Sequence, residues 1–86
     1  MFTNKAGDGR NNLCGAAISA QRKRMKLSQR ELAEKMQLEG IDLDKNAVQR
    51  IECGKRFVTD IELLAFSRIF QLTMEQLVSE QADGQK

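Results

Sequence analysis

The sequence predicts an all-α fold built from five helices. Three observations support this prediction. Its 86 residues include no proline, the residue that most strongly breaks helices. Ser or Thr is followed three residues later by Glu or Gln at three places, which is the capping-box signature of a helix start. Apolar residues recur with helical spacing after these places, and no segment is long enough and regular enough to predict a strand.

The first two helices are expected over residues 13–25 and 29–38. Asn12 is a suitable N-cap for the first, because its side chain can accept a hydrogen bond from a free backbone N–H. Ser28 opens the first capping box and therefore starts the second helix. Gly40 follows as a natural stop, since glycine readily takes the left-handed conformation that ends helices.

Residues 41–44 alternate apolar and polar side chains but are too few to form an independent strand. We expect residues 41–44 to form a turn. Its apolar residues Ile41 and Leu43, together with Leu38 at the end of the second helix, are expected to pack on the protein instead of contacting a ligand. Asp44 then caps a third helix over residues 45–53, which a glycine ends.

The fourth helix is expected over residues 60–70, after a capping box that begins at Thr59. Its apolar side chains lie nearly all round, which predicts a central, buried helix. Thr73 opens a third capping box and a short fifth helix that closes the core. The side chains predicted to be buried together are Leu32, Val48, Ile51, Leu64, Ile69 and Leu77.

Chain length predicts a single domain, because 86 residues are too few for two hydrophobic cores. The first eleven residues are rich in Asn, Gly and charge, without periodicity, so residues 1–11 are expected to be a disordered leader. The folded domain is expected to span residues 12–80, and residues 81–86 are expected to form a disordered tail.

Charge is divided unevenly along the chain. The net charge is +2, but residues 1–56 hold twelve basic and seven acidic side chains, a net charge of +5. Residues 57–86 hold two basic and five acidic side chains, a net charge of −3. This division indicates a surface with one side oriented toward phosphate. The alternative interpretation is an ordinary solvated surface of mixed charge.

Enzymatic chemistry is not expected. The chain has no histidine, which is the commonest general base and metal ligand, and no glycine-rich loop that opens a helix to hold phosphate. Its two cysteines, Cys14 and Cys53, match neither a metal site nor a disulfide framework, so both are expected as reduced thiols. We expect no metal, cofactor or small-molecule ligand. Without a membrane-spanning run or a secretory signal, a cytoplasmic protein is expected.

The second and third helices, joined by a turn, make a predicted helix-turn-helix. At 100° per residue the third helix has two faces. Val48 and Ile51 form its apolar face, and its other face is polar and rich in hydrogen-bonding groups. Such a polar face can contact base edges in the major groove of DNA. The side chains on that face are Lys45, Asn46, Gln49 and Arg50.

An ordered series of residues carries a family resemblance. It comprises Leu27-Ser28-Gln29, Glu31-Leu32-Ala33, Val48, Arg50-Ile51-Glu52 and Gly54-Lys55. With this series the chain resembles the Cro/C1-type (XRE-like) helix-turn-helix family of small DNA-binding regulators over roughly residues 13–79. The resemblance implies a five-helix, lambda-repressor-like DNA-binding domain. The turn inside this helix-turn-helix is about five residues longer than is usual in the family, which leaves the docking angle of the third helix open.

The resemblance also implies roles for particular residues. The base-contacting positions are Lys45, Asn46, Gln49 and Arg50, for which a solvated helical face is the alternative. The start of the second helix suits a phosphate oxygen because its backbone N–H groups are free and its dipole end is positive. The phosphate-contacting positions are Ser28, Gln29, Arg30, Lys55 and Arg56. Arg22 and Glu52 occupy positions at which the family often holds a structural ion pair.

Two functions follow as expectations. The first is a sequence-specific DNA-binding transcriptional regulator, repressor-like, bound to double-stranded DNA as a homodimer on a two-fold related site. The second is a protein-interaction module of the same fold, such as an antitoxin-like or regulator-binding partner. Phe57 and Val58 are then either an exposed apolar dimer or partner contact, or part of the core. Binding to DNA that weakens steeply with salt favours the first, and tight binding to a protein without DNA retention favours the second.

Overall fold

The computed structural model describes residues 9–79, and this range contains five α-helices and no strand. The expected all-α fold is therefore confirmed. Residues 1–8 and 80–86 lie outside the described range, together with most of the expected leader and the whole expected tail. The helices are α1 (Gly15–Arg24), α2 (Gln29–Leu38), α3 (Lys45–Glu52), α4 (Asp60–Phe70) and α5 (Met74–Val78).

Local hydrogen bonds start four of the five helices as the sequence predicts. At Ser28, Thr59 and Thr73 the hydroxyl accepts a hydrogen bond from the backbone N–H three residues on, and the side chain at that position accepts one in return. Asp44 accepts a hydrogen bond from the N–H of Ala47 and so caps α3. These short-range contacts satisfy backbone donors that would otherwise lack a partner within the helix.

The start of α1 differs from the prediction. The helix begins at Gly15, two residues later than expected, and its N-cap position is Cys14, whose side chain makes no cap hydrogen bond. Asn12 still supplies the cap from outside the helix, because its Oδ1 accepts a hydrogen bond from the Gly15 N–H at 2.8 Å. The amide nitrogen of Asn12 is bound elsewhere, which keeps the chain before Cys14 out of the helix.

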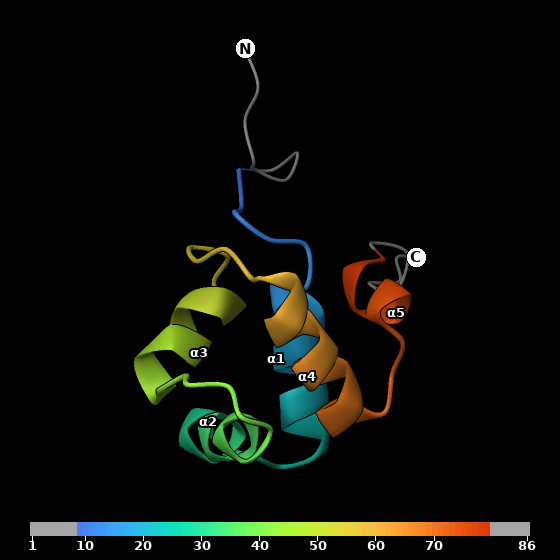
Figure 1. Ribbon diagram of the computed structural model, residues 1–86. Coiled ribbons are helices and arrows are strands. Elements are labelled where there is room, and N and C mark those ends of the chain that lie inside the picture. Colours follow the sequence, from blue (N-terminus) through green and yellow to red (C-terminus); the bar gives the residue numbers. More distant parts are fainter. Residues whose placement is uncertain (1–8, 80–86) are drawn as a thin grey trace.

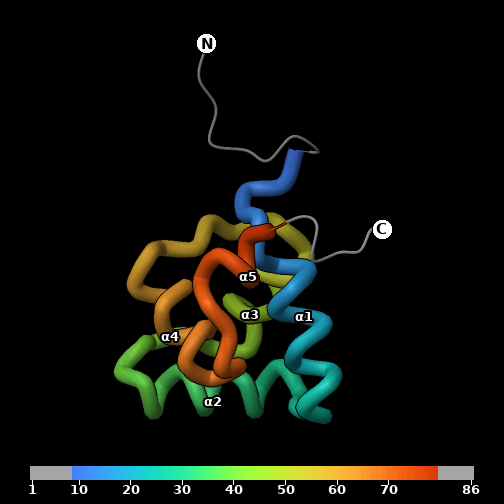
Figure 2. The backbone as a smooth tube through the Cα atoms, turned by 90° about the vertical axis from the view of Figure 1, so that its right-hand side faces the viewer, coloured from blue at the N-terminus to red at the C-terminus, as the bar shows by residue number. Residues whose placement is uncertain are grey.

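The core lies between the inner sides of the helices: α1 packs against α3, α4 and α5, α2 packs against α3 and α4, and α5 also packs against α4. Figure 1 shows α1 and α4 crossing at the centre, with α3 to one side and α2 below them; Figure 2 shows α2 running beneath the other helices. The side chains that are almost completely buried are Ile18, Leu32, Met36, Val48, Ile51, Phe66 and Leu77. None of the described helices is long and apolar enough to cross a membrane.

The prediction that α4 is buried all round is wrong. Ile61 is 65% exposed and Leu64 is 38% exposed, although both are large apolar side chains. Ile69 is only partly buried against the core. The apolar pattern of a helix shows that it can be buried, but the number of neighbouring helices decides how much of it is covered. Here those neighbours cover only one side of α4.

The turn between α2 and α3 packs on the core through only part of its apolar residues. Leu43 is buried and Ile41 is partly buried, as expected, whereas Leu38 is 88% exposed. Gly40 has a φ of +86°, and the N–H of Ile41 donates to the carbonyl oxygen of Met36. This tight reversal ends α2 and directs Leu38 outward while Leu43 turns in.

Candidate nucleic-acid interface

The helix α3 is anchored by one face and exposed on the other. Ala47, Val48 and Ile51 are buried on its inner side, packed against α1 and α2. The opposite face points to solvent at the side of the molecule (Figure 1). All four side chains expected to contact bases are exposed there: Lys45, Asn46, Gln49 and Arg50.

The expected ion pair between Arg22 and Glu52 is present. The Nε of Arg22 donates to Oε2 of Glu52 at 2.7 Å, and its Nη2 donates to Oε1 at 3.1 Å. Its Nη1 donates to the carbonyl oxygen of Leu27 at 2.8 Å. Both charged side chains are largely removed from water. This two-point pair fixes the end of α3 to α1 and to the start of the helix-turn-helix.

Gln29 has a different role from the one expected of its side chain. Its Nε2 donates to Oε1 of Glu52 at 3.1 Å, so the amide joins the ion pair and links α2 to α3. Its backbone N–H and that of Arg30 lie in the first turn of α2, next to the exposed Ser28. A phosphate at this end of α2 would therefore accept hydrogen bonds more readily from these backbone N–H groups than from the Gln29 amide.

Arg56 is also placed differently from its expected role at the interface. Its Nη1 and Nη2 donate to the two carboxylate oxygens of Glu62 at 2.9 and 3.0 Å, and Nη1 also donates to the carbonyl oxygen of Phe57. Burial by itself raises the pKa of Glu62, but the hydrogen bonds from Arg56 and Thr59 outweigh it, so this pKa lies below its ordinary value. We therefore assign Arg56 to holding the start of α4, and Lys55 remains exposed.

Two asparagines before α1 hold the segment that follows α3. The Nδ2 of Asn12 donates to the carbonyl oxygens of Ile51 at 3.1 Å and Arg56 at 2.8 Å. The backbone N–H of Asn11 donates to the carbonyl oxygen of Gly54 at 2.7 Å, and its Nδ2 donates to that of Lys55 at 3.0 Å.

Asn11 is therefore part of the folded structure, whereas the sequence placed it in a disordered leader. The partners of the two asparagines lie 39 to 44 residues away along the chain. No local pattern in the sequence points to contacts of that kind. Their effect is to fix the backbone from which Lys55 projects, beside the end of α3.

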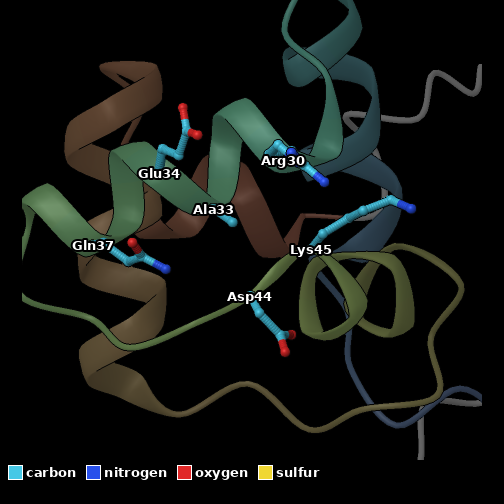
Figure 3. Close-up of a pocket in the computed structure, with 6 residues that line it drawn as sticks. All are labelled: Arg30, Ala33, Glu34, Gln37, Asp44 and Lys45. Atoms are coloured by element: carbon cyan, nitrogen blue, oxygen red, sulfur yellow. The ribbon is translucent and has the colours of Figure 1, made fainter.

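A groove of about 350 Å³ lies between α2 and α3. Figure 3 shows the ends of Arg30 and Lys45 extending toward the same side of it, while the carboxylates of Glu34 and Asp44 point in other directions. This side of the groove is consequently basic and adjoins the start of α2. Its lining residues are Arg30, Ala33, Glu34, Gln37, Asp44 and Lys45.

The two thiols lie in different environments. Cys14 is buried, which raises its pKa to about 11. Cys53 is exposed at the end of α3, and its thiol donates to the carbonyl oxygen of Gln49 at 2.9 Å. Within residues 9–79 no group of three or more His, Cys, Asp or Glu side chains is placed to hold a metal ion.

A solved structure has this arrangement of helices. No family model matches the chain, and no curated protein matches it either. The crystal structure of the P22 c2 repressor protein, in complex with synthetic operator 9T and in the presence of Tl⁺, matches with a TM-score of 0.66 and 26% sequence identity. The match covers 79% of this chain and 96% of the repressor chain. This chain is similar to the P22 c2 repressor.

The similarity defines the fold more closely. The five helices form the fold of a repressor helix-turn-helix domain, in which α2 and α3 are the paired helices. The 26% identity leaves most positions different, so the P22 c2 repressor supports the arrangement of helices more strongly than the role of any single side chain. The function of this chain must therefore be argued from its own residues, and above all from those on the exposed face of α3.

Proposed function

We propose that this chain is a sequence-specific DNA-binding transcriptional regulator of the Cro/C1 type, and that α3 enters the major groove. The exposed polar face of α3 carries this proposal, because it presents four hydrogen-bonding side chains on a helix whose other face is buried. The similarity to a repressor solved in complex with a synthetic operator supports it.

The four side chains suit base edges for different reasons. Asn46 and Gln49 can each pair with the two major-groove groups of adenine, and Arg50 can donate to both acceptors of guanine. Lys45 can reach a guanine or a nearby phosphate. The ion pair of Arg22 with Glu52 holds the helix at one angle, and a fixed angle is what lets short side chains meet particular bases.

Phosphate contacts are proposed for the edges of this face. The first turn of α2 offers the backbone N–H groups of Gln29 and Arg30 beside the Ser28 hydroxyl, in addition to the Arg30 guanidinium. Lys55 lies beyond the other end of α3. These contacts set the position of the protein on the duplex without selecting its sequence. Arg56 is left out of this set because Glu62 occupies its guanidinium.

The test is selection from a random duplex library at physiological salt, followed by titration of the selected duplex at several salt concentrations. We expect one recurring sequence and an affinity that falls as salt rises. Lys35→Ala is a suitable control, because Lys35 is an exposed cation of α2 outside the proposed contacts, and the variant should bind as the parent does. If a folded protein retains no duplex at low salt, DNA binding is wrong and the protein-interaction function becomes the better proposal.

A further inference from the structure

Lys26 lies in the turn between α1 and α2 with a backbone conformation that favours glycine. Its φ is +60°, in the left-handed region where a side chain crowds the carbonyl oxygen that follows it. The N–H of Lys26 donates to the carbonyl oxygen of Lys23 at 3.0 Å. The next N–H, that of Leu27, donates to the carbonyl oxygen of Arg22 at 3.0 Å. These two hydrogen bonds form a Schellman motif, in which the left-handed position is usually glycine.

Folding does not explain a lysine at this position. The side chain of Lys26 is exposed and forms no ion pair within residues 9–79. The end of α1 does not need its charge, because the last turn of that helix already holds three basic residues, which interact favourably with the helix dipole. Glycine at position 26 would relieve the crowding of the backbone and leave the packing of the core unchanged.

The surroundings of Lys26 are strongly basic. Between residues 15 and 30 the chain holds five cations and no carboxylate. Arg22 is paired with Glu52, but the other four cations are exposed and form no ion pair in the part of the chain that the structure describes: Lys23, Arg24, Lys26 and Arg30. Grouped positive charges repel one another, and an anion bound from outside removes this repulsion. The group therefore suits a phosphate.

The turn adjoins the surface proposed to contact DNA. Lys26 precedes Ser28, the N-cap of α2, by two residues, so their Cα atoms lie within about 8 Å of each other. Figure 2 shows the end of α1 beside the start of α2. Arg22 donates both to Glu52 at the end of α3 and to the carbonyl oxygen of Leu27, which fixes the turn relative to α3. A flexible lysine side chain in this turn can reach the phosphate at the start of α2 or the next one along the strand.

We propose that Lys26 is a further phosphate contact, and that it strengthens DNA binding at the expense of folding stability. This inference rests on the proposed function, because its ligand is the backbone of the duplex that α3 contacts. The contact extends the interface from the start of α2 to the turn that precedes it. It adds affinity for any duplex without selecting a sequence. Strained backbone positions of this kind occur preferentially at functional sites.

Lys26→Gly should change stability and DNA binding in opposite directions. Because the crowding is relieved, the Tm measured by circular dichroism should rise by a few degrees. Because the charge is lost, the Kd for the selected duplex and for random DNA should each rise about three- to tenfold at low salt. The slope of log Kd against log salt should fall by about one. Lys26→Arg should keep the salt slope of the parent, because the positive charge remains.

Gln71→Gly is the matched control for the backbone. Gln71 is the C-cap of α4, is exposed, and also has a positive φ, of 58°. Replacing it with glycine relieves the same kind of crowding without removing a charge. The Gln71→Gly variant should therefore have a raised Tm and the DNA affinity of the parent. A weaker binding of Lys26→Gly alone would then be due to the lost charge and not to the altered backbone.

Duplexes with one uncharged phosphate locate the contact. In a series of selected duplexes, each carries a methylphosphonate at a different position. At one position the replacement should weaken binding of the parent clearly more than binding of Lys26→Gly, which lacks the contact already. The inference is overturned if Lys26→Gly binds both kinds of duplex like the parent, if its Tm falls, or if no position shows this difference. The proposed function would still stand in each of these cases, whereas a folded parent that binds no duplex would refute both.

Discussion

Gly15 approaches the carbonyl oxygen of Ile51 so closely that a Cβ at position 15 would overlap that oxygen. The start of α1 thus packs backbone to backbone against the end of α3. The same Cβ would also come within 2.9 Å of Oδ1 of Asn12, whose amide holds the segment after α3. Glycine is required here by close approach, not by its backbone angles.

Gly15→Ala should therefore destabilise the protein, by about 1–3 kcal/mol, because α1 and the end of α3 must move apart. Helix propensity acts in the opposite direction, since alanine in a helix is favoured over glycine by about 1 kcal/mol. Urea unfolding measures the change. Ala20→Gly, at an exposed position of α1, is the control and should show only the propensity cost. A stabilised Gly15→Ala variant would contradict the close contact.

The Arg22–Glu52 pair gives a second prediction. Arg22→Ala should lower the free energy of unfolding by about 3–5 kcal/mol, because it leaves the nearly buried Glu52 carboxylate without its cation. Arg22→Ala combined with Glu52→Ala should cost less than the sum of the two single changes, since the unpaired charge is then gone. Additive costs in this double-mutant cycle would show that the two residues do not stabilise each other.

Acid should destabilise the protein through Glu62. Its pKa in the folded state is below the ordinary value, so its contribution to stability is fully present above the ordinary pKa of about 4.3. That contribution is lost as pH falls through the lowered pKa. Glu62→Gln should reduce the free energy of unfolding at pH 7 by about 1.5–3 kcal/mol. In this variant the free energy of unfolding should also fall less steeply as the pH is lowered. Thermal unfolding of both proteins between pH 7 and pH 2 measures this. If stability falls equally steeply with pH in the variant, other carboxylates cause the destabilisation by acid.

Side chains of α3 should determine which DNA sequence is bound, whereas Lys55, just beyond the end of α3, should contribute affinity for any duplex through its charge. Asn46→Ala or Gln49→Ala should cost about 1–3 kcal/mol on the selected duplex and little on random DNA, because each removes contacts to one base. Lys55→Ala should weaken binding to both duplexes similarly and reduce the salt slope by about one. Titrations on both duplexes at several salt concentrations provide the comparison. If Asn46→Ala and Lys55→Ala behave alike, the assigned roles are wrong.

Cys53 offers a chemical probe of the same face. A thiol reagent at pH 8 should modify Cys53 quickly, because it is exposed, and Cys14 only when the protein unfolds, because it is buried with a pKa of about 11. Adding the selected duplex should slow the modification of Cys53, which lies at the end of α3, whereas random DNA at moderate salt should protect less. Mass spectrometry after timed quenching measures both rates. Equal rates with and without the selected duplex would place DNA away from α3.

The helices and the composition of the α3 face could be predicted from the order of residues along the chain. Capping contacts span three residues, so the starts of four helices could be predicted from adjacent positions. The two faces of α3 follow from its period, because burial of Val48 and Ile51 leaves Asn46 and Gln49 outside. The Arg22–Glu52 pair was predictable only through the family resemblance.

Two features depend on how distant segments pack together: which hydrogen-bond donors already have a partner, and which apolar sides of a helix stay uncovered. The sequence predicted Gln29 and Arg56 as free donors at the surface. In the fold, Gln29 donates to the Glu52 carboxylate and Arg56 donates to the Glu62 carboxylate. Asn12 reads as a helix cap, but its amide also bonds to two carbonyls about forty residues away. Leu64 was predicted in the core, but within residues 9–79 no other helix covers its side of α4, and it is exposed. Such outcomes depend on which distant segments arrive nearby, and the pattern within one helix does not contain that information.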